Sequence, residues 1–228
     1  MIRPPIANVT QLFIIIAPKP KPDFYLIDKI LVRCFSTGIT PILVINKCDL
    51  LSDKLKNSIL SQYANVCEIL IVSAKHNINI DAIVDKLQGN LNVFTGQSAV
   101  GKSSLLNAIM PQTFSAVGEL SKKIERGKNC TRHCEIFNLN QNTQIADTPG
   151  FSVLDIDTID SKTLCDYYPD FVALQKDCTF NTCVHVGESD SNCAIKRAVH
   201  SGLINADRYN RYCELYRQLK DKEDKLYE

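Results

Sequence analysis

A glycine-rich segment, Gly96-Gln97-Ser98-Ala99-Val100-Gly101-Lys102-Ser103, constrains the fold of this chain more than any other feature. It follows the short run 92–95, which has the character of a strand, and it precedes the helical run 102–110. The glycines let backbone N–H groups close around a phosphate, and the start of a helix adds a favourable field for an anion. The segment therefore predicts a phosphate-binding loop between a strand and a helix of an α/β domain.

Individual side chains of this loop have expected roles in holding a nucleoside triphosphate. Lys102 can bridge the β- and γ-phosphate oxygens, and the Ser103 hydroxyl can ligate Mg²⁺. Asp147 ends another predicted strand and precedes Thr148-Pro149-Gly150. Its carboxylate can hold Mg²⁺ through water, and the Gly150 N–H can meet the γ-phosphate. We include the neighbouring Ser104 in the predicted nucleotide-binding set.

A second segment, Asn46-Lys47-Cys48-Asp49, follows the apolar strand-like run 41–45 and indicates which base is bound. Asp49 can accept hydrogen bonds from both N1–H and the exocyclic amine of guanine. Adenine would leave this carboxylate unpaired, at a cost of about 1–3 kcal/mol. Asn46 can tether neighbouring loops, and the stem of Lys47 can lie along one face of the base. Ser73-Ala74-Lys75 follows the next predicted strand and offers a backbone N–H to guanine O6.

The order of these segments is unusual. In an ordinary GTPase the base-recognition segment comes after the phosphate loop, whereas here residues 46–49 precede residues 96–103. The chain is therefore predicted to be a circularly permuted P-loop GTPase domain of the α/β class. Moving the segments along the chain keeps the contacts of the sheet and changes only the connections.

Strands and helices alternate through most of the sequence, which predicts a parallel-rich sheet covered by helices. After about residue 160 the strand-like runs stop, so we expect a GTPase domain over 1–159 and a small, mostly helical zinc-binding domain over 160–228. The expected strands are 11–16, 41–45, 66–72, 92–95, 134–139 and 143–146, and the expected helices are 24–35, 54–63, 80–87, 102–110 ended by Pro111, and a long charged helix at the C-terminus.

Four potential metal ligands, Cys178, Cys183, His185 and Cys193, lie within sixteen positions of the C-terminal part. Three thiolates and one imidazole are ligands that zinc favours, and with no open position they indicate a structural site. The alternative is a set of buried, unligated cysteines with a surface histidine. A small module with few apolar residues would gain folding energy directly from the metal. One structural Zn²⁺ is therefore expected here.

Composition excludes several classes of protein. The chain has 228 residues, of which 45% are apolar, and a formal net charge of +1, as is typical of a soluble globular protein. The apolar run 12–17 is too short to span a bilayer or to act as a secretory signal, so we expect a cytoplasmic protein with no membrane partner. Ten cysteines without such a signal favour thiols and a metal site over disulfides. We expect a monomer that does not bind DNA.

The permuted order, with a Cys-Cys-His-Cys cluster directly after it, resembles the bacterial ribosome small-subunit-dependent GTPase A family. Further similar segments are Arg3-Pro4-Pro5-Ile6-Ala7-Asn8-Val9, Gly127-Lys128-Asn129-Cys130-Thr131-Arg132-His133 and Ala194-Ile195-Lys196, so the resemblance covers nearly the whole chain. It implies hydrolysis of GTP to GDP and phosphate, stimulated by the 30S ribosomal subunit, contact with 16S rRNA and a role late in small-subunit maturation. It also implies that Thr131 is the switch threonine that ligates Mg²⁺ and touches the γ-phosphate.

Two differences from the family bear on this expectation. The family normally begins with an OB-fold domain that contacts ribosomal RNA, whereas this sequence starts almost at the GTPase domain, as a fragment or a shortened form would. The family often has His-Thr-Thr where this chain has Asn129-Cys130-Thr131, and Phe151 stands where many GTPases have a water-orienting glutamine. Asn129 can orient the attacking water only by hydrogen bonds, and His133 is an alternative polar candidate. We therefore expect slow intrinsic hydrolysis that a partner accelerates.

A second hypothesis is a GTP-dependent ribosome- or RNA-binding module with little or no hydrolysis. A zinc scaffold that needs no nucleotide would conflict with the intact phosphate loop. The basic segment 121–133 can contact RNA phosphates, or it can be a solvated surface. Near the C-terminus, Arg208 and Arg211 belong to a run of mixed charge that favours a solvated helix over an RNA-reading one. Tyr209, Tyr212 and Tyr216 are expected to pack that helix onto the module.

Overall fold

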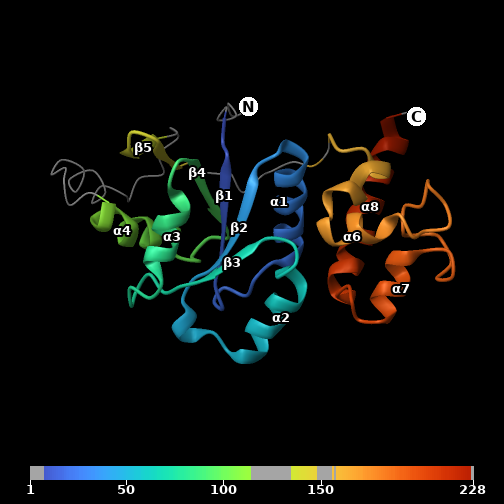
Figure 1. Ribbon diagram of the computed structural model, residues 1–228, viewed down its shortest axis with the longest axis horizontal. Helices are drawn as coiled ribbons and strands as arrows, with labels where there is room; N and C mark the ends of the chain where they lie inside the picture. Colours follow the sequence, from blue (N-terminus) through green and yellow to red (C-terminus); the bar gives the residue numbers. More distant parts are fainter. Residues whose placement is uncertain (1–7, 114–134, 148–155, 157, 227–228) are drawn as a thin grey trace. The chain divides into compact units, whose positions relative to one another are not determined.

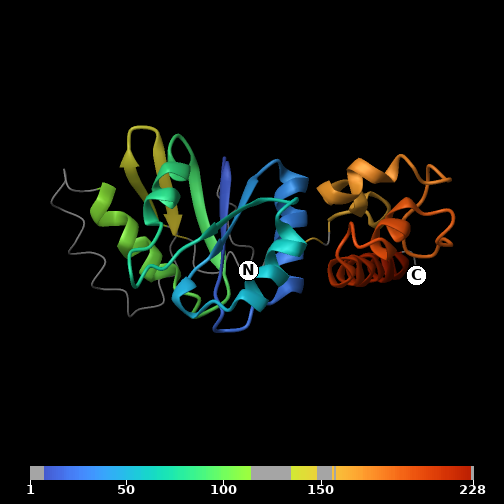
Figure 2. The ribbon, with the colours of Figure 1, turned by 60° about the horizontal axis from the view of Figure 1, so that its bottom comes forward.

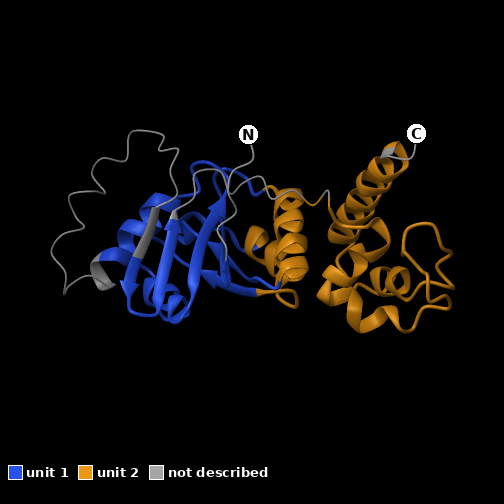
Figure 3. Ribbon diagram, turned by 90° about the horizontal axis from the view of Figure 1, so that it is seen from above, with its two compact units in different colours: residues 1–22, 38–53, 68–153 blue, residues 23–37, 54–67, 154–228 orange. Residues whose placement is uncertain are grey.

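The computed structural model describes residues 8–113, 135–147, 156 and 158–226 (Figure 1). The chain divides into two compact units, which Figure 3 shows in different colours. Unit 1 contains residues 1–22, 38–53 and 68–153, and unit 2 contains residues 23–37, 54–67 and 154–228. Two segments from the first third of the chain are thus grouped with the C-terminal residues. The domain limits 1–159 and 160–228 stay a prediction.

Unit 1 is built on a sheet of six strands in the order β3-β2-β1-β4-β6-β5. The strands are β1 (Gln11–Ile16), β2 (Thr40–Ile45), β3 (Glu68–Ile71), β4 (Leu91–Gly96), β5 (Glu135–Asn140) and β6 (Thr143–Asp147). Every neighbouring pair is parallel except β5 and β6, which form an antiparallel hairpin at one edge (Figure 2). The predicted parallel-rich sheet is confirmed.

The central strand β1 pairs with β2 on one side and with β4 on the other. All six of its residues are buried, and the last five form the continuous apolar run that is typical of a parallel strand with both faces covered. Ile14 lies in register with Leu43 of β2 and with Thr95 of β4. Because the strands are parallel, the segments that follow β2, β3 and β4 emerge at the same edge of the sheet. The predicted base and phosphate segments are those segments.

Two helices of unit 1, α3 (Ile80–Leu87) and α4 (Lys102–Thr113), contribute to a buried core with β1, β2 and β4. Phe13 and Phe94 stack within this core at a centroid distance of 4.9 Å. The expectation that Pro111 ends α4 was wrong, because the helix continues to Thr113. A proline lacks the backbone N–H that would donate to the preceding turn of the helix. Only two residues of α4 follow Pro111, so the helix loses little hydrogen bonding by continuing past it.

Unit 2 is helical in its described residues. It contains α1 (Phe24–Thr37), α2 (Asp53–Tyr63, whose first residue belongs to unit 1), the 3₁₀ helix η2 (Ser161–Tyr167), α6 (Pro169–Gln175), α7 (Ala194–His200) and α8 (Ala206–Leu226). Tyr168, Phe171 and Tyr212 pack edge to face or tilted at its centre, with ring centroids 4.8–5.0 Å apart. Tyr209 and Tyr216 pack against the same core, as the tyrosine spacing predicted.

A buried group of charges joins three helices of unit 2. Asp28 on α1 is fully buried, and its carboxylate pairs with Arg208, at 2.6 Å, and with Arg211, both on α8. Arg208 also pairs with Asp170 of α6 at 3.1 Å, and Tyr63 donates a hydrogen bond to Asp28. Burial raises the pKa of Asp28, and the two guanidinium groups oppose this rise. The expected solvated helix is therefore wrong for Arg208, which is 2% exposed, and for Arg211.

Among the residues that the structure describes, no helix has the length and apolar character needed to cross a membrane.

Candidate nucleotide site and metal centre

The phosphate loop joins β4 to α4 and lines a cavity of about 420 Å³. The cavity is bounded by Lys47, Ser98, Ala99, Gly101, Lys102, Ser103 and Ser104. Gly96 has φ +142° and Gly101 has φ +97°, conformations that side chains rarely adopt. A Cβ at Gly96 would also lie 2.1 Å from the carbonyl oxygen of Ile15, so a glycine is required there.

Lys102 is held inside the loop by its own backbone. Its ammonium group donates to the carbonyl oxygens of Gly96, at 2.7 Å, and Gln97, at 2.8 Å. These contacts keep the positive charge beside the cavity, at the start of α4. A lysine and a helix start that converge on one cavity suit a phosphate group. The donor set is therefore compatible with the triphosphate of a nucleotide.

Asn46 connects the base-recognition segment to the phosphate loop. Its side-chain amide donates to the carbonyl oxygen of Val100 at 2.9 Å, and its Oδ1 accepts from the backbone N–H of Ala74 at 3.1 Å. Asn46 is 2% exposed, so these hydrogen bonds are protected from water. Three segments that are distant in the sequence thus meet at one side chain, as predicted for a tethering asparagine.

Lys47 adds a second connection between the same segments. Its ammonium group donates to the carbonyl oxygen of Ala99 at 2.7 Å and to that of Lys19 at 2.9 Å. Lys47 has φ +58°, a left-handed conformation that begins the 3₁₀ helix η1 (Cys48–Leu50). The contact with Lys19 was not predicted, because a backbone carbonyl leaves no trace in the side-chain pattern.

Asp49 lies in η1 and is partly exposed. Its Oδ1 accepts a hydrogen bond of 2.7 Å from the Ser73 hydroxyl, and its Oδ2 lies 3.7 Å from His76 Nε2. The hydrogen bond from Ser73 is the main cause that lowers the pKa of Asp49. The carboxylate is therefore ionised at neutral pH, the form that accepts both guanine donors. Lys75 completes the predicted segment after β3 and also favours the ionised form.

Replacing Gly101 with alanine is expected to weaken GDP binding about tenfold. A Cβ there would lie 2.4 Å from Asn46 Nδ2 and would displace an amide that two hydrogen bonds hold. Gly89→Ala is the matched control, because Gly89 also has a positive φ, +73°, but its Cβ would meet nothing within 4 Å. Titration with a fluorescent GDP analogue measures both variants. Equal affinities would contradict the role given to Asn46.

The predicted metal ligands Cys178, Cys183, His185 and Cys193 come together in unit 2, with their ligand atoms within 4.8 Å of one another. The three sulfur atoms lie 3.7, 3.2 and 3.5 Å from His185 Nδ1, in that order. A tetrahedral zinc ion with ordinary bond lengths needs a sulfur–nitrogen separation of about 3.5 Å. The donor set and its spacing therefore fit zinc.

Burial shifts the pKa values of these ligands, and a bound metal ion would offset the shift of the thiols by stabilising their thiolate forms. Burial lowers the pKa of His185, which favours the neutral imidazole that can ligate, and it raises the pKa of the Cys183 and Cys193 thiols. Thiolates at such a site need a positive partner. The backbone N–H of Ala194 points to Cys178 Sγ at 3.3 Å and would support a thiolate there.

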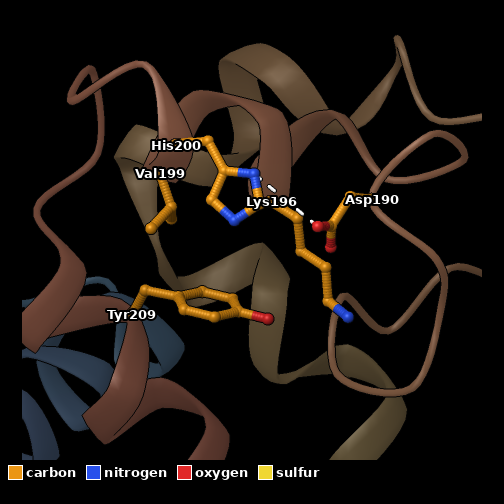
Figure 4. Close-up of a pocket in the computed structure, with 5 residues that line it drawn as sticks. All are labelled: Asp190, Lys196, Val199, His200 and Tyr209. Atoms are coloured by element: carbon orange, nitrogen blue, oxygen red, sulfur yellow. Dashed lines mark ion pairs between the residues drawn. The ribbon is translucent and has the colours of Figure 1, made fainter.

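A second cavity of unit 2, of about 200 Å³, is lined by Asp190, Lys196, Val199, His200 and Tyr209 (Figure 4). His200 faces Asp190 across it, with 3.6 Å between the ring nitrogen Nδ1 and the carboxylate. Lys196 donates to the carbonyl oxygen of Glu188, and the Tyr209 hydroxyl donates to that of His185 at 2.7 Å. The polar groups of this cavity thus make internal contacts that brace the ligand-bearing segment.

The comparisons with known proteins agree with this geometry. The model of the RsgA GTPase family matches residues 1–157. The chain is 40% identical over 223 residues to a protein of Ruminiclostridium cellulolyticum named small ribosomal subunit biogenesis GTPase RsgA, an alignment that covers 97% of this chain and 72% of that protein. The chain belongs to the RsgA GTPase family. A protein of the same name from a Geobacillus species is 36% identical over 228 residues, with 97% of this chain and 76% of that protein covered.

Solved structures confirm the fold class. YjeQ from Thermotoga maritima is similar with a TM-score of 0.78 and 31% identity, covering 94% of this chain and 72% of that one. YloQ, described as a circularly permuted GTPase, has a TM-score of 0.76 and 30% identity, covering 96% and 71%. The permuted order of residues 46–49 and 96–103 in the sequence therefore corresponds to a circularly permuted GTPase fold.

Some predicted RsgA site residues lie outside the described residues. Asn129, Thr131 and Gly150 are among them, as are Phe151, His133 and the whole basic segment 121–133. Asp147 ends β6 as expected, and the structure describes its backbone only. Of the three expected Mg²⁺ ligands, Ser103 is therefore the one whose side chain the structure describes, at the start of α4.

The sequence reasoning missed the two contacts that complete the base-recognition segment. One is the carbonyl oxygen of Lys19, and the other is His76, which follows Ser73-Ala74-Lys75 directly. The position of His76 was a hint that could have been used, because a side chain able to carry charge directly follows a predicted base-binding segment. The missing information was that the turn after residue 73 folds back toward Asp49.

Proposed function

We propose that this chain binds GTP, hydrolyses it to GDP and phosphate, and assists late maturation of the small ribosomal subunit. The observation that carries the nucleotide part is the link through Asn46, which joins the guanine-specific segment to the phosphate loop. One ligand with a guanine base and a chain of phosphates would use both. The names of the relatives support the ribosomal part.

In this proposal each site residue has a distinct role. Lys102 holds the β- and γ-phosphate oxygens, and the Gly150 N–H meets the γ-phosphate. Ser103, Thr131 and Asp147 hold Mg²⁺, which when bound neutralises phosphate charge. Asn129 orients the attacking water by hydrogen bonds, because its amide is not basic enough to take a proton. Asp49 selects guanine through N1–H and the exocyclic amine, and the segment Ser73-Ala74-Lys75 lies at guanine O6.

The proposed partner is the 30S subunit, with 16S rRNA as the contacted surface, and binding there stimulates hydrolysis. The protein acts as a monomer in the cytoplasm, without DNA or a membrane as partner. Its GTPase domain spans 1–159 and its zinc-binding domain spans 160–228.

The test is GTP turnover by the purified chain, alone and with 30S subunits, with the Lys102→Ala protein as the background. Clear stimulation by 30S subunits supports the proposal. Binding of GTP and of 30S subunits without stimulated turnover would instead support a GTP-dependent binding module, the alternative that the change to Asn129 favours. Failure to bind 30S subunits at all would refute the proposed partner for residues 1–228.

We also propose that the Cys178, Cys183, His185 and Cys193 cluster holds one structural Zn²⁺. Elemental analysis of the purified protein is expected to give about one zinc per chain, and Cys183→Ser is expected to lower this value sharply. Cys213→Ser is the matched control, because Cys213 is equally buried in the same core but lies outside the cluster. Equal zinc contents in the two variants would refute the site.

A further inference from the structure

The turn after β3 brings His76 against the guanine-selecting carboxylate in two ways. Ser73 and Ile78 close the turn by exchanging backbone hydrogen bonds of 3.0 and 3.1 Å. Inside it, the backbone N–H of His76 lies 3.4 Å from Ser73 Oγ, which itself donates to Asp49 Oδ1. The His76 ring reaches the other carboxylate oxygen, with Nε2 3.7 Å from Oδ2. His76 thus acts on Asp49 through its backbone and through its side chain.

The acceptor capacity of the carboxylate makes this arrangement specific. An ionised carboxylate has about four acceptor positions, two on each oxygen. Ser73 occupies one position on Oδ1, and His76 stands beside Oδ2. These two contacts do not use all the acceptor positions of the carboxylate, so it can still receive the two parallel donors of guanine, N1–H and the exocyclic amine. His76 and the base can therefore use Asp49 together.

We propose that His76 is a positioning residue for guanine recognition, and that its protonated imidazole holds Asp49 in the orientation that the base requires. This inference rests on the proposed guanine nucleotide site. A histidine changes charge between pH 5 and 8, so the orienting contact becomes an ion pair toward the acidic end of that range. Guanine nucleotides then bind more tightly as the pH falls, and the gain is lost as the pH rises.

The surrounding charges support this direction. Asp49 is the charged group of η1 that His76 meets, Cys48 precedes it in η1, and Lys75 lies on the turn itself. The hydrogen bond from Ser73 lowers the pKa of Asp49, so the carboxylate stays ionised from pH 6 to 8. The side chains of His76 and Asp49 are 48% and 25% exposed, so water screens the ion pair and its effect is modest.

The experiment compares GDP dissociation constants at pH 6 and pH 8 for wild type, His76→Ala and His76→Gln. The affinity of wild type is expected to gain roughly two- to fivefold at pH 6 relative to the change seen in His76→Ala, as an exposed ion pair allows. His76→Gln can donate a hydrogen bond but carries no charge, so its pH profile is expected to follow His76→Ala. Other titrating groups, including the phosphates of GDP, are common to all three proteins and cancel in the comparison.

Identical pH profiles for wild type and His76→Ala would overturn the inference, and so would tighter binding by wild type at pH 8. The proposed nucleotide site is tested separately by the preference for GDP over ADP, in wild type and in Asp49→Asn. Guanine preference that Asp49→Asn removes, together with identical pH profiles, would refute the role of His76 alone. The absence of guanine preference in wild type would refute the nucleotide site itself.

Discussion

Replacing Lys102 with alanine is expected to lower GTP turnover at least about a hundredfold. The ammonium group lies among the carbonyl oxygens of Gly96 and Gln97 at the cavity, where it would face the β- and γ-phosphates. Removing it takes away a positive charge at the place where negative charge is transferred, and one such preorganised group is worth about 10²–10³ in rate. Release of phosphate measured under saturating GTP checks the prediction.

Lys54→Ala is the control for this experiment, because Lys54 is an exposed lysine near the start of α2 and lies outside the cavity. Its turnover should equal that of wild type. A Lys102→Ala protein that keeps more than about a tenth of wild-type turnover would show that Lys102 does not have the proposed catalytic role.

Replacing Arg208 with alanine is expected to lower the free energy of unfolding by about 3–5 kcal/mol, as is usual when one member of a buried ion pair is removed. The change leaves the fully buried Asp28 with one guanidinium partner in place of two, and it removes the guanidinium that pairs with Asp170. It also removes a guanidinium that stacks on the ring of Tyr168 at 4.7 Å. Denaturation by urea, followed by circular dichroism, measures the loss.

Arg217→Ala on the same helix is the matched control, because Arg217 is exposed and its loss should cost less than about 0.5 kcal/mol. Arg208→Lys separates charge from geometry. A lysine keeps the positive charge but cannot reach Asp28 and Asp170 with one planar fork, so most of the loss should remain. Equal stabilities of Arg208→Ala and Arg217→Ala would show that the buried charges do not stabilise unit 2.

The sequence by itself determined the features that depend on local chemistry and on spacing. Short-range rules placed the strands and helices to within a few residues, and the order of residues 46–49 and 96–103 indicated the permuted GTPase fold. The cluster of Cys178, Cys183, His185 and Cys193 was also readable, because ligands so close in sequence can converge on one ion. In each case the residues that act together are near one another or stand at the ends of parallel strands.

Only the tertiary structure decided which distant side chains meet. Arg208 lies 180 positions after Asp28, and its run of mixed charges predicted a solvated helix, yet both side chains are buried against each other. The contacts of Lys47 with Lys19 and of His76 with Asp49 were likewise absent from the motifs. The physical reason is that a charge pattern records which residues could face water. Whether they do is determined by the elements that pack around them, and for Arg208 on α8 these include α1 and α6.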